Sequence, residues 1–182
     1  MSSQRIGKYA CLEVERKYLL DQPPAGLLEQ GYRWQIVDRY ITNTRLRLRR
    51  ITSISGQQLL KFTQKYQDAG QDETQTTITN MYLDEGEYRH LAQLPASEIV
   101  KKRYHYDFQN HQYRIDIFEG KLAGLILAEI ELERVEDIAG LSFPPFALAE
   151  VTADLFFTGG NLATLAEEKL KNELVKWLRK KR

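Results

Sequence analysis

The sequence has 182 residues, which suits one domain with a full hydrophobic core. Its 26 Lys and Arg residues almost balance its 25 Asp and Glu residues, and the formal net charge of +1 disfavours a protein that binds polyanions through bulk charge. The one cysteine, Cys11, excludes an intramolecular disulfide and a zinc site built from several cysteines. Any anion site in this chain must therefore be local and built by geometry.

Strands are predicted through most of the first 83 residues, where runs of residues alternate in polarity or are rich in β-branched and aromatic side chains. They are expected at residues 13–20, 34–41, 44–51, 58–66 and 76–83. Between the first two strands, residues 23–31 are expected to form a short helix that ends at Gly31. Asp84 and Glu87 form a capping-box pattern, which predicts a helix that Pro95 stops.

More strands are predicted after Pro95, with a hairpin around Asn110. They are expected at residues 99–108, 112–120 and 125–135, followed by a short extended or turn segment at 149–156. Asn161 is expected to cap a terminal helix at 161–182, in which leucines recur at helical spacing. Because strands mostly follow strands, we predict an α+β fold with a mainly antiparallel sheet and helices packed outside, in a single domain of residues 1–182.

Several predicted strands carry a row of charged residues on one alternating face, mostly of one sign, with Lys17 on the same face as Glu13 and Glu15. The acidic residues are Glu13 and Glu15, then Glu129, Glu131 and Glu133; the basic residues are Arg45, Arg47 and Arg49, then Lys61 and Lys65. Like charges at this spacing repel one another unless opposite charges lie nearby. A closed barrel supplies those opposite charges, because every strand then turns one face toward a common interior. We therefore predict a closed barrel with a charged lumen and apolar outer faces.

A lumen lined by both signs of charge suits a phosphate chain bridged by a divalent cation. Arg and Lys bind phosphate oxygens, and Arg can do so with two hydrogen bonds. Paired carboxylates bind Mg²⁺ or Mn²⁺, which also accept phosphate oxygens and water. The pattern indicates attack on a phosphoanhydride while the metal and the cations neutralise the developing charge.

The motifs resemble those of the CYTH, or triphosphate tunnel metalloenzyme, family over nearly the whole chain. The residues Glu13-Val14-Glu15-Arg16-Lys17 are similar to the family's Glu-x-Glu-x-Lys signature. Further matches follow in order at Arg47 and Arg49, Lys61, 102–104, 115–120, 124–125, 128–131, 150–154 and 161–163. The resemblance implies an eight-stranded antiparallel β-tunnel, a triphosphate-bearing substrate, and Mg²⁺ or Mn²⁺ as cofactor.

The resemblance also implies roles for single residues. The metal ligands would be Glu13, Glu15, Glu129 and Glu131. The phosphate-binding residues would be Lys17, Arg47, Arg49, Lys61, Arg103 and Arg114. Lys17 would also act in catalysis, and a lysine of the terminal helix, Lys169 or Lys171, would assist the leaving group.

The sequence departs from the family pattern on the strand after Lys61. Many bacterial relatives carry Arg-x-Glu-x-Glu there, whereas residues 71–78 contain one glutamate, Glu73. We expect Gln75 or Thr77 to stand where the family has a glutamate, which leaves the lumen neutral at that point. A missing carboxylate predicts slow turnover with good triphosphate affinity.

The leading interpretation is a metal-dependent triphosphatase that acts on inorganic tripolyphosphate, with a nucleoside or thiamine triphosphate as a further possible substrate. One alternative is cyclisation of ATP, as in adenylate cyclase relatives; another is binding of triphosphate or polyphosphate without turnover. A nucleic-acid-binding barrel is disfavoured by the net charge and by the interior placement of the cations. The expected partner is a triphosphate-containing small molecule rather than nucleic acid, with the chain as a monomer or homodimer.

The expected location is the cytoplasm. The N-terminus has no apolar run typical of a signal peptide, and a single thiol fits a reducing compartment. The most apolar stretch, residues 122–130, is too short to span a bilayer, so no membrane partner is expected.

Overall fold

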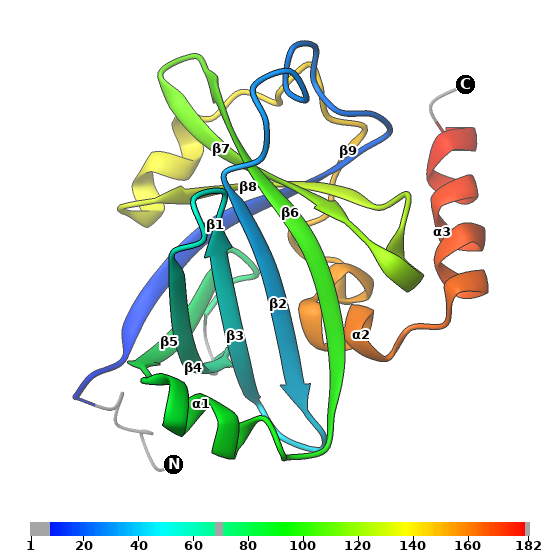
Figure 1. Cartoon of the computed structure of the whole chain (residues 1–182). Helices are drawn as coiled ribbons and strands as arrows, with labels where there is room; N and C mark the ends of the chain where they lie inside the picture. The colour runs from blue at the N-terminus through cyan, green and yellow to red at the C-terminus, as the bar shows by residue number, and fades with distance from the viewer. Residues whose placement is uncertain (1–7, 68–70, 181–182) are drawn as a thin grey trace.

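The computed structural model of the chain describes residues 8–67 and 71–180 (Figure 1). The strands are β1 (Cys11–Leu20), β2 (Trp34–Ile41), β3 (Leu46–Ser53), β4 (Gln58–Tyr66), β5 (Gln75–Tyr82), β6 (Ala96–Phe108), β7 (His111–Phe118), β8 (Ile126–Leu132) and β9 (Ala149–Glu150). The α-helices are α1 (Glu85–Leu91), α2 (Gly159–Thr164) and α3 (Glu167–Lys180). Short 3-10 helices are η1 (Gly120–Leu122), η2 (Val135–Gly140) and η3 (Leu155–Phe157).

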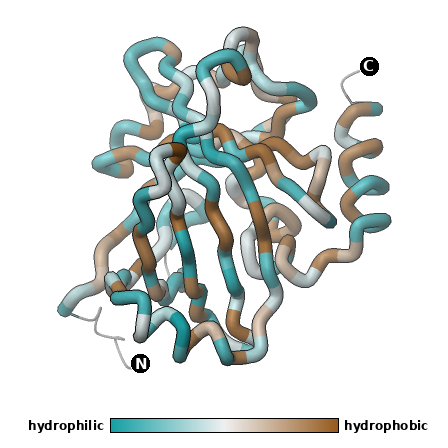
Figure 2. Tube along the Cα trace, in the orientation of Figure 1, coloured by the Kyte–Doolittle hydropathy of each residue, from teal (hydrophilic) through white to brown (hydrophobic). Residues whose placement is uncertain are grey.

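Eight of these strands close into an antiparallel barrel, which confirms the predicted tunnel. Along the sheet they run β5-β4-β3-β2-β6-β7-β8-β1, and β1 closes the circle by pairing with β5. The short strand β9 pairs with the end of β1 on the edge opposite β8, beyond the residues of β1 that pair with β5. The strands show the expected alternation of hydrophilic and hydrophobic residues along the trace (Figure 2), so each strand turns one chemical face inward and the other outward.

The outer apolar face is covered partly by helix and partly by loops. Helix α1 covers the β3–β4 side, where Tyr88 is buried with Leu48 and Leu60. Its capping box is formed as predicted: Asp84 Oδ1 accepts from the Glu87 N–H at 2.8 Å, and Glu87 Oε2 accepts from the Asp84 N–H at 2.9 Å. On the side of β1, β7 and β8, loop residues provide the cover instead.

One of these covering loops is residues 23–31, where the helix prediction is wrong. The segment forms turns, and its Leu27 is fully buried against the outer face of the barrel. Gly26 and Gly31 adopt left-handed backbone angles, with φ of 76° and 74°. A left-handed residue so near the start of the segment ends right-handed helix geometry before a full turn can form.

The predicted terminal helix is instead two helices, α2 and α3, which break at Leu165. That residue adopts extended backbone with ψ of 137°. The break lets Leu162 and Leu170 reach the same buried cluster. Asn161 is not the cap: Thr158 precedes α2, and Asn161 Nδ2 donates to the Leu155 carbonyl at 2.6 Å. Residues 181–182 of the prediction lie outside the described residues.

The inward faces of several strands change from charged to apolar along their length. Leu19, Ile99 and Leu127 each lie two residues from an inward charged side chain, and they pack in one cluster with residues of η3, α2 and α3. The contact is close at Gly159, where an added Cβ would lie 1.8 Å from the hydroxyl oxygen of Tyr40. The charged lumen therefore ends against an apolar floor built partly by α2.

Among residues 8–67 and 71–180, the structure holds no helix that is long and apolar enough to cross a membrane.

Candidate functional site

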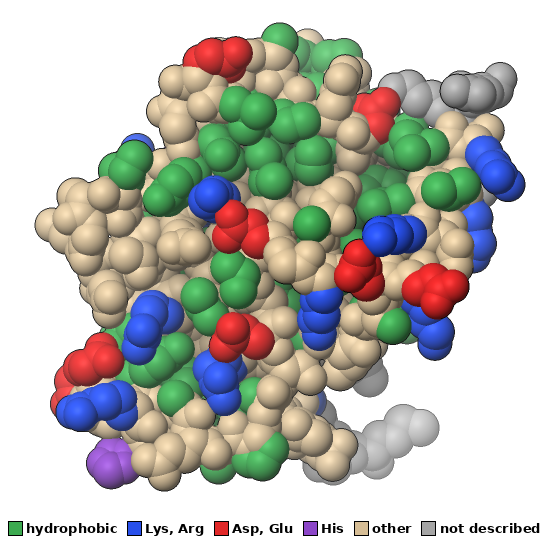
Figure 3. All heavy atoms as spheres, turned by 45° about the vertical axis from the view of Figure 1, so that its right-hand side comes forward, with side chains coloured by type: hydrophobic (Ala, Val, Ile, Leu, Met, Phe, Trp, Pro, Cys, Tyr) green, Lys and Arg blue, Asp and Glu red, His purple; other side chains and the backbone are tan. Residues whose placement is uncertain are grey.

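The barrel interior holds a cavity of about 840 Å³. Among the described residues, nine Lys and Arg side chains and six Asp and Glu side chains line it, so positive charge is in surplus there. Outside, on the face in Figure 3, basic and acidic side chains are interspersed instead of forming one basic surface. The local concentration of positive charge that an anion site would need therefore lies inside the barrel.

The structure brings ten of the predicted site residues to this one cavity. They are Glu13, Glu15, Lys17, Arg47, Arg49, Lys61, Arg103, Arg114, Glu129 and Glu131. Lys169 is not among the residues that line it, because it lies exposed on α3. Lys171 is on the same helix and pairs with Glu167 at 2.6 Å. Neither of the two lysines predicted on the terminal helix therefore lies at the cavity.

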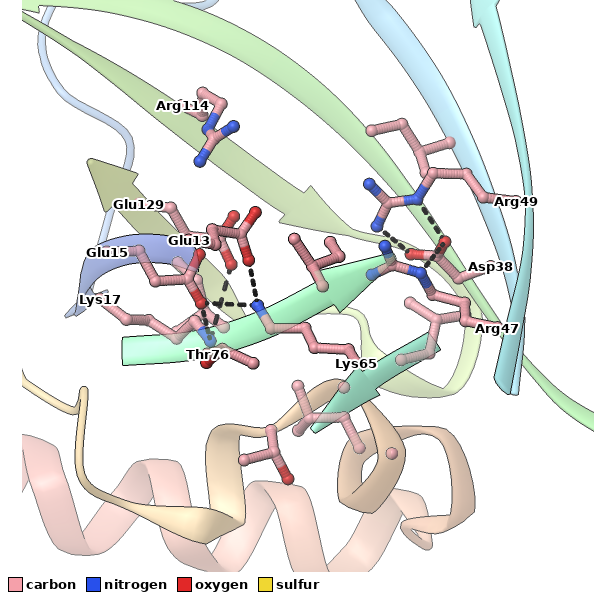
Figure 4. A pocket seen from close by; sticks show the side chains of 18 of the residues that line it. Glu13, Glu15, Lys17, Asp38, Arg47, Arg49, Lys65, Thr76, Arg114 and Glu129 are labelled. Atoms are coloured by element: carbon pink, nitrogen blue, oxygen red, sulfur yellow. Dashed lines mark hydrogen bonds and ion pairs between the residues drawn. The ribbon is translucent and has the colours of Figure 1, made fainter. Parts of the chain in front are cut away.

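On the β2–β3 side, one buried carboxylate serves two guanidinium groups (Figure 4). Asp38 is 1% exposed and accepts from Arg49 Nε at 2.5 Å and Arg49 Nη2 at 2.8 Å. Arg47 Nε lies 3.6 Å from the same carboxylate. Burial alone would raise the pKa of Asp38, but Arg49 and Arg47 outweigh it and hold the pKa well below its ordinary value. One positive charge on this side is left without a carboxylate.

Lys61 extends this positive region along β4. The register places it directly across from Arg49. Its own burial, and then the neighbouring Arg49 and Arg47, lower the pKa of Lys61. An anion that enters here would relieve the mutual repulsion of these three cations.

On the β1–β8 side, carboxylates are in the majority, and lysines lie between them. Lys65 Nζ lies 2.5 Å from Glu13 Oε2 and 3.1 Å from Glu15 Oε1. Lys17 Nζ lies 3.8 Å from Glu15 Oε1 and 3.7 Å from Glu129 Oε1. Burial would raise the pKa of Glu129, but Lys17 and other nearby cations hold it well below its ordinary value. Glu129 is therefore held in the ionised form that a metal ligand needs.

The wall between the two sides is built around Asp116, which is 1% exposed. It accepts from Arg103 Nε and Nη2, both at 2.6 Å, and from the Lys101 ammonium. Arg103 Nη2 also donates to Glu129 at 2.9 Å. Next to it, Arg114 Nη1 donates to the half-exposed Glu131 at 2.7 Å. Arg103 is thus positioned by two carboxylates before any ligand binds.

No metal- or phosphate-binding role was predicted for four residues that the structure places at the cavity or in its wall: Asp38, Lys65, Lys101 and Asp116. Each lies two or four residues from a predicted site residue, or on a strand that faces one, so the period-2 alternation contained the signal. The alternation does not say which inward residues pair with one another, because those pairs join strands that are far apart in sequence.

The expected position of the altered strand is wrong by one residue. Thr76, Ile78 and Asn80 line the cavity, and Gln75 and Thr77 do not. In the register of β1 and β5, Thr76 lies across from Glu13. Successive side chains on a strand point to opposite faces, so a shift of one residue exchanges the inward and outward sets. The lumen is neutral along β5 as predicted, but through a different set of residues.

Mg²⁺ and Mn²⁺ fit this site by donor chemistry, since four glutamates offer oxygen ligands in one cavity. Within the described part of the chain, no three His, Cys, Asp or Glu side chains are already gathered closely enough to hold a metal ion. The carboxylates are instead engaged with lysine and arginine, as the distances above show. Binding a divalent cation would therefore require some of these ion pairs to open.

An apolar strip lies beside the positive region. Ile36, Ile51 and Leu59 are aligned across β2, β3 and β4, one pleat from the row that contains Asp38, Arg49 and Lys61. Trp34 also lines the cavity, two residues before Ile36. The cavity can thus accept an uncharged group next to its cations.

No family model matches this chain, and no curated protein does either. Among solved structures, two crystal structures of the protein NE1496 are similar to it, one described as a hypothetical protein and the other as an inorganic triphosphatase. The first is 24% identical, covers 85% of this chain and 99% of its own, and has a TM-score of 0.57. The second is 22% identical, covers 84% and 95%, and has a TM-score of 0.56. The likeness is one of fold.

Proposed function

We propose that this chain, which has the triphosphate tunnel fold of the CYTH family, is a triphosphatase that hydrolyses inorganic tripolyphosphate with Mg²⁺ or Mn²⁺. One observation carries the proposal: a single cavity combines a positive surplus on β2, β3 and β4 with four glutamates on β1 and β8. A linear polyanion that brings a divalent cation complements both halves of this lumen. The description of NE1496 as an inorganic triphosphatase supports the same substrate.

The residues of this chain divide the work by charge. Arg47, Arg49 and Lys61 hold phosphate oxygens and neutralise the charge that develops on them. Arg103 and Arg114, each anchored by a carboxylate, bind the phosphate chain from the opposite wall. When bound, the divalent cation at the glutamates adds positive charge and lowers the pKa of water.

The reaction is attack by a water oxygen on a terminal phosphorus. The new P–O bond forms as the bridging P–O bond on the opposite side breaks, and the water proton is lost to solvent. The products of tripolyphosphate are orthophosphate and pyrophosphate. Lys17, placed between Glu15 and Glu129, neutralises charge on the reacting phosphate. Lys169 and Lys171 have no part in this scheme, because neither lines the cavity.

A substrate panel tests the proposal. Tripolyphosphate, ATP, thiamine triphosphate and pyrophosphate are incubated with the protein and either Mg²⁺ or Mn²⁺, and released orthophosphate is measured. We expect release from tripolyphosphate that stops when the metal is chelated. Phosphate release that survives full chelation would contradict metal dependence. Calorimetric binding of tripolyphosphate without release under either metal would identify a binding protein instead of an enzyme.

The apolar strip favours one second candidate, cyclisation of ATP. Trp34, Ile36 and Ile51 could contact the base and ribose of a nucleotide whose phosphates lie on Arg49 and Lys61. The products distinguish the two reactions, because cyclisation releases pyrophosphate and cyclic AMP from ATP, whereas hydrolysis releases orthophosphate.

A further inference from the structure

Lys65 occupies the space that the first two proposed metal ligands share. Its ammonium lies 2.5 Å from Glu13 Oε2 and 3.1 Å from Glu15 Oε1, and Figure 4 shows it reaching between them. The Lys65 ammonium thus donates to both carboxylates at once.

We propose that Lys65 is an internal counter-ion of Glu13 and Glu15, which a divalent cation must displace before it can bind there. The inference rests on the proposed function in one respect, the assignment of these two glutamates to the metal. Divalent cations bind carboxylate oxygens at about 2.0–2.6 Å, which leaves no room for an ammonium hydrogen-bonded to the same oxygens. Two cations this close would also repel each other strongly in a partly buried site.

The inward positions of β5 offer Lys65 no alternative carboxylate. Thr76 lies across from Glu13, and the next inward positions on β5 are Ile78 and Asn80. None of these three residues has a carboxylate with which Lys65 could pair after a metal displaces it. Lys65 and the metal therefore compete for the same pair of glutamates.

Arg103, which also contacts a proposed metal ligand, is less free to leave than Lys65. Arg103 also makes two hydrogen bonds with Asp116, so it stays anchored whatever happens at Glu129. Within the described part of the chain, Lys65 forms ion pairs with Glu13 and Glu15 alone. Once displaced, its ammonium lies beside the cavity, where a phosphate chain offers new acceptors. Triphosphate should thus raise the affinity for metal, and metal the affinity for triphosphate by the same factor.

Lys61 provides a matched control on the same strand. It lies four residues from Lys65 on the same inward face and lines the same cavity. Among the described residues it forms no ion pair within 4.0 Å, and its nearest charged neighbours in register are cationic. Lys61→Met and Lys65→Met therefore remove the same charge from the same face, but only the second frees the glutamates.

The test is calorimetric titration of Mn²⁺ into the protein without any phosphate. We expect Lys65→Met to bind Mn²⁺ at least about 10-fold more tightly than wild type, and Lys61→Met to change the affinity much less. Lys65→Arg keeps the charge and should bind within about threefold of wild type. Circular dichroism confirms that each variant is folded, and Lys65→Gln replaces Lys65→Met if that variant is not.

Equal Mn²⁺ affinities for Lys65→Met and Lys61→Met would overturn the inference, as would tighter binding by Lys65→Arg. These results are distinguishable from failure of the proposed function. If wild type hydrolyses tripolyphosphate with Mn²⁺ while the two Met variants bind Mn²⁺ equally, only the role of Lys65 is wrong. If neither wild type nor Lys65→Met binds Mn²⁺ or tripolyphosphate, the proposed function itself fails.

Discussion

The β2–β3 side of the lumen and the β1–β8 side carry opposite surpluses of charge, as the two groups in Figure 4 show. On the first side Asp38 is shared by Arg47 and Arg49, and a positive charge remains. On the second side the glutamates need Lys65, which reaches across from β4. A barrel can hold both arrangements because each surplus faces the other across a cavity. The proposed ligand, a phosphate chain carrying a metal ion, would complement both surpluses at once.

The largest effect on stability should follow from removing the shared carboxylate of the β2–β3 side. Asp38→Asn leaves the buried Arg49 and the half-buried Arg47 without their shared carboxylate. Removing one partner of a buried ion pair costs about 3–5 kcal/mol, so we expect the free energy of unfolding at pH 7, measured in urea, to fall by about 3 kcal/mol or more. The control Glu85→Gln opens the exposed pair with Arg50 and should cost less than about 1 kcal/mol.

The same variant has a defined pH dependence. Because the pKa of Asp38 is depressed in the folded protein, its stabilising contribution is present above the unfolded pKa, about 4, and is lost as pH falls through the folded pKa. The difference in unfolding free energy between wild type and Asp38→Asn should therefore be smaller at pH 3 than at pH 7. An equal difference at both pH values would show that Asp38 stabilises by packing.

Breaking the β1–β8 side should affect catalysis more than folding. Glu129→Gln removes a proposed metal ligand while it keeps the volume of the side chain. Changes in residues that only support metal ligands cost about 10–100-fold, so we expect a direct ligand to cost more than about 100-fold in metal-dependent kcat. The exposed Glu133, beyond β8, is the control, and Glu133→Gln should leave kcat unchanged. Similar losses in both variants would remove Glu129 from the site.

The positive surplus is tested by binding. Arg49→Ala should weaken tripolyphosphate binding by about 1.5–3 kcal/mol, the scale of a charge-assisted hydrogen bond. Arg45 lies on the same strand face but is exposed and stacks on Tyr66 at 4.7 Å, so Arg45→Ala should cost about 1 kcal/mol or less. Calorimetry that gives Arg49→Ala the affinity of wild type would refute the phosphate assignment.

The smallest expected effect is an increase in kcat. Thr76→Glu places a carboxylate across from Glu13, where it can hold Lys65 or a metal, and we expect kcat with Mn²⁺ to rise by up to about 10-fold. Gln75→Glu adds the same charge to a residue that does not line the cavity and should leave kcat unchanged. If both variants match wild type, the neutral β5 does not limit the rate.

Much of the site could be predicted from local pattern. Side chains on a strand alternate between two faces, so Glu13, Glu15 and Lys17 had to share a face, as did Arg47 and Arg49. Their opposite charges then required a closed barrel. The helix at Glu85–Leu91 could also be predicted from local sequence, because its capping box joins two residues that are three positions apart.

Only the tertiary structure decided which charges meet. Lys65 bonds Glu13 across 52 residues of sequence, and no local pattern states which strands become neighbours when the barrel closes. The register of the strands is equally hard to predict from local sequence: a shift of one residue on β5 makes Thr76, instead of Gln75, face the lumen. Leu165 likewise breaks the terminal helix so that Leu162 and Leu170 reach one buried cluster. Local sequence determines which residues of a strand point to the same face. Which residues of other strands they then contact depends on barrel closure, register and packing between segments that are distant in sequence.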